Sequence, residues 1–154
     1  MGIKTTNDII LTLQKKDIIF EKLFNRYGLI KYEDDSDIFS TIVFHIVSQM
    51  LSLKVADVIK KRIISLCDGN VCSEKLLILT REQLRACGIS YSKADYILDF
   101  AFNYSIGKYD FKYMKNLSDN EIINYLRQIK GVGLWTAEMI SLFSLGKNNI
   151  FSYD

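Results

Sequence analysis

Two glycines separated by one residue, Gly131 and Gly133, constrain the fold of this chain more than any other feature. Apolar residues at helical spacing lead into the pair and out of it, so the sequence predicts two helices joined by a tight turn. Such a turn leaves backbone N–H groups free at the start of the second helix, where the helix dipole also attracts anions. The segment has no third glycine and no preceding strand, which excludes a dinucleotide-binding loop. An ordinary helix–helix connection is the alternative interpretation.

Helical periodicity extends over most of the remaining chain. Apolar residues recur with a period near 3.6 and strict alternation is rare, so the sequence predicts an all-α fold. Two of the expected apolar faces are specific: Val55, Val58, Ile59 and Ile63 in the segment 54–67, and Ile18, Leu23 and Phe24 in the segment 17–28. Thr80 and Ser118 each begin a capping box, which marks a helix start. The expected helices cover about 7–13, 17–28, 37–50, 54–67, 80–88, 90–104, 118–129 and 134–145.

Composition indicates a single folded domain, residues 1–154. Apolar residues make up 49% of the chain and charged residues 25%, which argues against disorder. The net charge of +2 is too small to indicate a nucleic-acid partner by itself. The single histidine, His45, excludes a Ser-His-Asp triad and a side-chain zinc site. The three cysteines are too few and too unevenly spaced for a disulfide framework.

The N-terminal segment is polar, and no apolar run is long enough to span a bilayer. We therefore expect a protein that is not secreted and has no membrane partner. Its expected location is the cytoplasm, with the bacterial nucleoid, or the nucleus.

The residues around the glycine pair carry a family resemblance. Ile129 before the pair and Leu134-Trp-Thr-Ala-Glu-Met139 after it resemble the helix-hairpin-helix DNA glycosylases. Within that superfamily the chain looks most like the 3-methyladenine DNA glycosylase II type, which acts on alkylated bases. Segments 49–56, 88–94 and 117–126 resemble further parts of the same family in the same order. The resemblance therefore covers residues 17–154.

This resemblance implies a helical glycosylase fold with the hairpin at 130–134, and a role in base-excision repair. The implied reaction is hydrolysis of the N-glycosidic bond of alkylated purines in double-stranded DNA. An enzyme that acts on a base inside a duplex must flip the nucleotide out of the stack. The backbone of Gly131, Val132 and Gly133 would then hold phosphates. A monovalent cation on the hairpin backbone is implied too, with no other cofactor and no metal-ligating side chain.

Met50 is the residue that the resemblance places in the gap left by the flipped base. A flexible, polarisable side chain suits that task. Gln49, immediately before it, would hydrogen-bond the orphaned base or the backbone. Met50 also fits the apolar stripe of its expected helix, so a core position is the alternative.

Trp135 is the expected wall of the base pocket, and Met139 lines the same wall one turn later. A purine alkylated at N3 or N7 is cationic, and its stacking on indole contributes about 1–2 kcal/mol when desolvated. In the lyase branch of the superfamily a catalytic lysine occupies the position of Trp135. We therefore expect a monofunctional enzyme that uses water and does not cleave the strand.

The family's catalytic aspartate falls at Asp154 or one residue beyond it. We therefore expect a chain that is incomplete at its C-terminus and a monomer whose catalysis is impaired. The alternative function is a non-catalytic DNA-binding helix-hairpin-helix module or an inactive remnant of the enzyme. A third hypothesis is a helical protein-interaction domain with a fortuitous hairpin.

Overall fold

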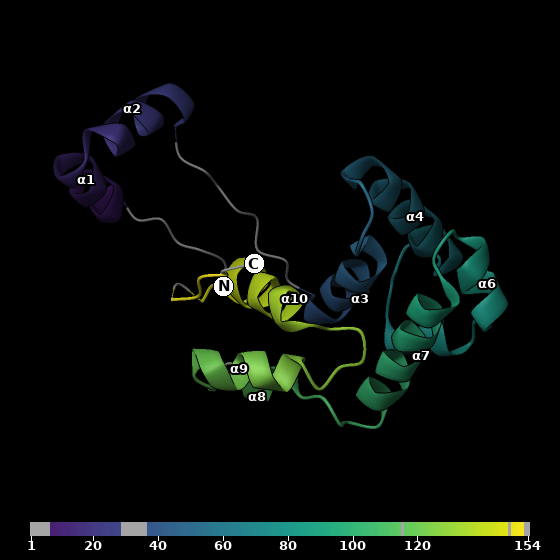
Figure 1. The fold of residues 1–154 in the computed structure, drawn as a ribbon. Coiled ribbons are helices and arrows are strands. Elements are labelled where there is room, and N and C mark those ends of the chain that lie inside the picture. Colours follow the sequence, from purple (N-terminus) through teal and green to yellow (C-terminus); the bar gives the residue numbers. More distant parts are fainter. Residues whose placement is uncertain (1–6, 29–36, 115, 148, 153–154) are drawn as a thin grey trace.

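The computed structural model describes residues 7–28, 37–114, 116–147 and 149–152, and this part of the chain contains helices and turns but no strand (Figure 1). The predicted all-α fold is confirmed. The elements are α1 (Asn7–Lys16), α2 (Ile18–Tyr27), α3 (Ile38–Ser48), α4 (Leu53–Leu66), α5 (Ser73–Leu77), α6 (Arg81–Ala86), α7 (Tyr91–Ser105), α8 (Phe111–Met114), α9 (Asp119–Leu126), α10 (Leu134–Met139) and the π-helical segment η1 (Ile140–Ser144).

Short polar side chains set the helix starts at the positions that the sequence predicts. The Asp17 carboxylate accepts the Ile19 N–H at the start of α2. Thr80 and Gln83 form the predicted capping box of α6, with both reciprocal hydrogen bonds present. Each such cap satisfies N–H groups that the first helical turn leaves without intrahelical partners.

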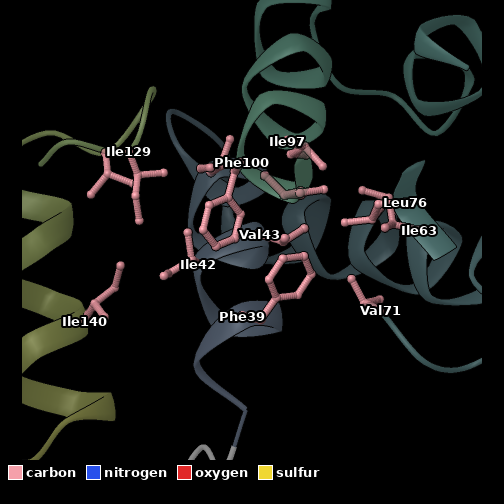
Figure 2. Packing of buried hydrophobic residues seen from close by; sticks show 14 of the residues in the cluster. Phe39, Ile42, Val43, Ile63, Val71, Leu76, Ile97, Phe100, Ile129 and Ile140 are labelled. Atoms are coloured by element: carbon pink, nitrogen blue, oxygen red, sulfur yellow. The ribbon is translucent and has the colours of Figure 1, made fainter. Parts of the chain in front are cut away.

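The core is built around α3. Its residues Ile42, Val43, Ile46 and Val47 have no exposed surface. Figure 2 shows Ile42 and Val43 among side chains from α4, α5, α7 and η1, together with Ile129 from the turn after α9. Phe39 of α3 also stacks on Phe100 of α7, with ring centroids 4.9 Å apart. A single apolar cluster therefore joins segments that are far apart in the sequence.

Two expectations about helix faces are wrong. In α4, Ile59 and Ile63 are buried as predicted, whereas Val55 and Val58 are exposed and Ala56 is buried instead. Because Ala56, Ile59 and Ile63 define the side of α4 that faces the core, Val55 lies at the edge of that side and Val58, one position before Ile59, points about 100° away from Ile59. None of the α2 side chains is buried. The helix contacts α1, and Figure 1 shows this pair apart from the other helices, which leaves the apolar face of α2 without a covering core.

The sequence did not predict α5, α8 or the π-helical turn of η1. The two helices have five and four residues, which is too short for a 3.6-residue period to be visible. In the described part of the chain, none of the helices combines the length and hydropathy needed to cross a membrane.

Candidate nucleic-acid interface

The glycine pair lies in a turn between α9 and α10 that the core holds on both sides. Ile129 and Val132 are buried, and the Val132 N–H donates to the Ile129 carbonyl at 3.0 Å. Gly133 is the N-cap of α10 and is exposed. The turn therefore presents the start of a helix to solvent on a backbone that buried side chains fix in place.

The two glycines are needed for different reasons. Gly131 has φ +84°, and a Cβ there would lie 2.5 Å from Cδ2 of Tyr96 on α7. Both the left-handed backbone and the close approach of Tyr96 require glycine. Gly133 has φ −81°, and a Cβ there would meet nothing within 4 Å. Packing within the chain explains Gly131, whereas the space beside Gly133 is open to a partner.

Gln49 connects the end of α3 to this turn. Its Nε2 donates to the Gly131 carbonyl at 2.6 Å and lies 3.5 Å from Oγ1 of Thr136 on α10. The turn between α3 and α4, residues 49–52, therefore lies beside the hairpin. One hydrogen of the Gln49 amide group is therefore used within the protein. The predicted hydrogen bond from Gln49 to an orphaned base stays a prediction.

Met50 lies outside its helix. The helix α3 ends at Ser48, and Met50 has a left-handed backbone with φ 56°. Its side chain has an exposed fraction of 101%, and Leu53 nearby is almost fully exposed. The alternative that Met50 belongs to the apolar stripe of the core is therefore wrong, because the chain leaves the helix before Met50 and turns outward. A non-glycine residue in this conformation costs about 1–2 kcal/mol.

The first turn of α7 is the third segment at this place. Ser90 caps the helix, and the Lys93 ammonium reaches across to the end of α3. Its Nζ donates to the Val47 carbonyl at 2.8 Å and to the Gln49 carbonyl at 2.6 Å. Burial lowers the pKa of Lys93. Sequence reasoning assigned Lys93 no role, because its partners lie more than forty residues away.

The predicted pocket residues lie on α10, directly after the hairpin. Trp135 has an exposed fraction of 49%, and Met139 is half-buried. Between them, Thr136 and Ala137 are buried, so the helix turns Trp135 away from the core. Lys130, which lies before the glycine pair, pairs through its Nζ with the Asp99 carboxylate on α7 at 2.6 Å.

Two further sequence predictions concern catalysis and metals. Asp154 lies outside the described residues. Within the described residues no group of three or more His, Cys, Asp or Glu side chains is arranged to hold a metal ion. Three segments therefore meet here: the turn with Gln49 and Met50, the first turn of α7, and the hairpin, which continues into α10 with Trp135.

Comparison with known proteins identifies relatives of one kind. No family model matches the chain. DNA-3-methyladenine glycosylase 1 of Schizosaccharomyces pombe is 28% identical to it over all of this chain and 73% of the relative. A putative DNA-3-methyladenine glycosylase of Bacillus subtilis is 27% identical over 76% of this chain, which spans only 43% of that relative.

Solved structures agree with the sequence relatives. The crystal structure of a DNA-3-methyladenine glycosidase from Bacillus halodurans is 30% identical, with a TM-score of 0.80, over 96% of this chain and 68% of that one. The 3-methyladenine DNA glycosylase of S. pombe in complex with abasic DNA is 28% identical, with a TM-score of 0.81, over 92% and 72%. The chain therefore belongs to the DNA-3-methyladenine glycosylase family of helix-hairpin-helix DNA glycosylases.

Proposed function

We propose that this chain binds double-stranded DNA that carries an alkylated purine and hydrolyses the N-glycosidic bond of that base. The nucleoid or the nucleus would be its place of action. The observation that carries the proposal is the convergence of an open hairpin, the fully exposed Met50 and the half-exposed Trp135 at one place. A relative of known structure is in complex with abasic DNA, which supports the same partner.

The hairpin would hold the DNA backbone. Backbone N–H groups at the start of α10 attract phosphate oxygens, and the absence of a side chain at Gly133 lets the phosphate approach closely. Contacts of this kind position the protein without reading sequence. A repair enzyme needs this property, because damage occurs in every sequence context.

A monovalent cation on the hairpin backbone is part of the proposal. The carbonyls of Ile129 and Gly131 already accept hydrogen bonds from the Val132 N–H and the Gln49 amide. Each carbonyl oxygen has two acceptor lone pairs, so the turn retains acceptor capacity for a cation. The cation would neutralise phosphate charge beside the open start of α10.

Met50 would fill the space that the flipped nucleotide leaves. Its side chain projects from the protein, as a group that enters a base stack must. Inserted apolar side chains unstack a base step at a cost of a few kcal/mol, which wider protein contact offsets. The strained left-handed backbone at Met50 is the type of conformation that persists where function requires it.

Trp135 would select the base. The face of indole attracts a cationic alkylated purine by about 1–2 kcal/mol more than a neutral base when water is excluded. Alkylation also weakens the glycosidic bond, so selective binding and easier cleavage act on the same bases. Because Trp135 stands where the lyase branch has a lysine, water would be the nucleophile. The carboxylate of Asp154 would stabilise the developing sugar cation.

The test uses duplexes with a single 7-methylguanine and matched undamaged duplexes. We expect release of free 7-methylguanine, abasic sites that break only on alkaline treatment, and no protein–DNA adduct after borohydride. Trp135→Ala should lower the excision rate about fivefold to thirtyfold, as expected for loss of about 1–2 kcal/mol in a desolvated site. Asp154→Asn tests the carboxylate.

Three results would contradict parts of this proposal. Duplex binding without any base release would contradict the proposed hydrolysis and support the alternative function, a non-catalytic DNA-binding module. A borohydride adduct would overturn the monofunctional assignment. Failure to bind either duplex at low salt would contradict the DNA partner altogether.

A further inference from the structure

Lys93 is a cation directed into the protein at the edge of the proposed interface. It belongs to the first turn of α7, and its side chain is partly buried. Its Nζ lies 2.8 Å from the Val47 carbonyl oxygen and 2.6 Å from that of Gln49. Both carbonyls belong to the C-terminal end of α3, which is the element that leads to Met50.

A lysine suits this position for electrostatic reasons. The last four carbonyls of a helix have no intrahelical N–H partners, and the helix dipole makes this end negative. An ammonium group offers three donors and can hold two carbonyls together. Burial lowers the pKa of Lys93, as expected for an ammonium group that has lost part of its water shell.

Gln49 is held from two directions at once. Lys93 binds its backbone carbonyl, and its own side-chain amide donates to the Gly131 carbonyl in the hairpin. The next residue is Met50, which is left-handed and fully exposed. Because the Met50 side chain projects into solvent, its direction depends on how firmly Gln49 is held.

We propose that Lys93 is a positioning residue that fixes the turn carrying Met50 relative to the hairpin. The inference rests on the proposed function of Met50 as the group that replaces the flipped base. It adds a residue that acts through Gln49 and need not touch DNA. Two of the three ammonium donors are used by carbonyls, which argues against Lys93 as mainly a phosphate contact.

The experiment separates base flipping from binding and from chemistry. The duplex carries one 2-aminopurine at the target position, and its fluorescence rises when this base leaves the stack. Flipping is read from this signal and affinity from anisotropy with undamaged duplex at fixed salt. The variants are Lys93→Met, which keeps the apolar stem, Lys93→Arg, which keeps the charge, and Met50→Ala. Lys75→Met is the control, because Lys75 pairs with Asp68 and belongs to α5, outside the three segments.

We expect Lys93→Met to lower the flipping signal or rate about tenfold to a hundredfold, the range for a displacement near 1 Å in a preorganised site. Affinity for undamaged duplex should change less than about threefold, because the hairpin is intact. Lys93→Arg should recover most of the flipping, and Lys75→Met should match the wild type. Thermal denaturation checks each fold, and Lys93→Gln replaces Lys93→Met if the latter does not fold.

The experiment distinguishes failure of the inference about Lys93 from failure of the proposed function of Met50. Loss of flipping in Met50→Ala but not in Lys93→Met overturns the inference about Lys93 and leaves the proposed function standing. An equal loss of undamaged-duplex affinity in Lys93→Met also overturns it, since Lys93 would then be a phosphate contact. Normal flipping in Met50→Ala overturns the role of Met50 and this inference with it. None of these readouts depends on base hydrolysis.

Discussion

At the scale of single residues, the two glycines of the hairpin have different structural environments. Gly131 is required by its own backbone and by Tyr96, whereas Gly133 has neither a left-handed backbone nor a close neighbour. A sequence pattern presents the two glycines as equivalent. Only the geometry shows that one stabilises the turn and the other leaves space beside it.

Alanine substitutions should separate these two roles. Gly131→Ala forces a left-handed alanine against Tyr96 and should lower the free energy of unfolding by about 1–2 kcal/mol or more. Gly133→Ala should change stability by less than about 0.5 kcal/mol but weaken duplex binding, because its methyl group occupies the phosphate approach. Urea denaturation and anisotropy measure the two effects. Unchanged duplex affinity in Gly133→Ala would contradict the clamp.

Replacing Met50 with glycine should raise the stability of the fold while it removes the proposed function of the side chain. Met50→Gly should raise the free energy of unfolding by up to about 1 kcal/mol, because glycine adopts φ 56° without strain. The same change removes the side chain proposed to enter the base stack, so flipping should be lost. Met50→Leu, which keeps an apolar side chain, is the matched control. A Met50→Gly variant that is both less stable and fully active would contradict the assignment.

At the scale of elements, most helix starts were predictable, whereas the end of the helix before Met50 was not. Asp17, Asp37, Thr80 and Ser90 cap the expected helices, because a short polar side chain before an apolar run acts locally. The end of α3 at Ser48 was not predicted, since apolar residues continue in register to Met50. Tertiary contacts end this helix, because Lys93 and Gly131 hold Gln49 in a non-helical conformation.

The last helix shows a second limit of periodicity. The sequence predicts one helix over 134–145, whereas α10 gives way to the π-helical η1 at Ile140. The Leu145 N–H donates to the Ile140 carbonyl, five residues back. A wider turn shifts which residues face the core without breaking the helical pattern, so a 3.6-residue period fits both arrangements.

The start of α9, the helix that leads into the hairpin, should depend on pH. The Ser118 N–H donates to the Glu121 carboxylate at 2.8 Å, and hydrogen bonds from Ser118 lower the pKa of Glu121. Folding therefore favours the charged form, so this stabilisation is present above the ordinary glutamate pKa of about 4.3 and is lost as pH falls through the lower folded value. Glu121→Gln should lower the melting temperature near neutral pH, with a difference that shrinks in acid. A difference independent of pH would contradict this cap.

At the scale of the whole molecule, the packing of the core brings together the segments of the candidate interface. Residues 49–52, 90–93 and 127–133 are remote in sequence, and the packing of α7 and the post-α9 turn on α3 brings them together. The family resemblance named the hairpin, Met50 and Trp135 one by one. It could not reveal the contacts among Gln49, Lys93 and Gly131, because long-range hydrogen bonds leave no local pattern.

The salt dependence of binding should report how the whole molecule holds DNA. The net charge is only +2, and the proposed clamp uses backbone N–H groups at the hairpin. Each phosphate that a cation neutralises contributes about 0.9 to the slope of log affinity against log salt. A clamp of this kind predicts that log affinity falls with log salt with a slope of magnitude roughly 2–4, measured by anisotropy on one undamaged duplex.

The variants assign this slope to particular residues. Lys60→Met and Lys61→Met test two lysines of α4, and a lysine that meets a phosphate should lower the magnitude of the slope by about 1 when it is replaced. Gly133→Ala should weaken binding at every salt concentration without changing the slope, because it removes space and no charge. A slope of about 6 or more would show a phosphate footprint far larger than the hairpin supports, and a slope near zero would contradict phosphate binding.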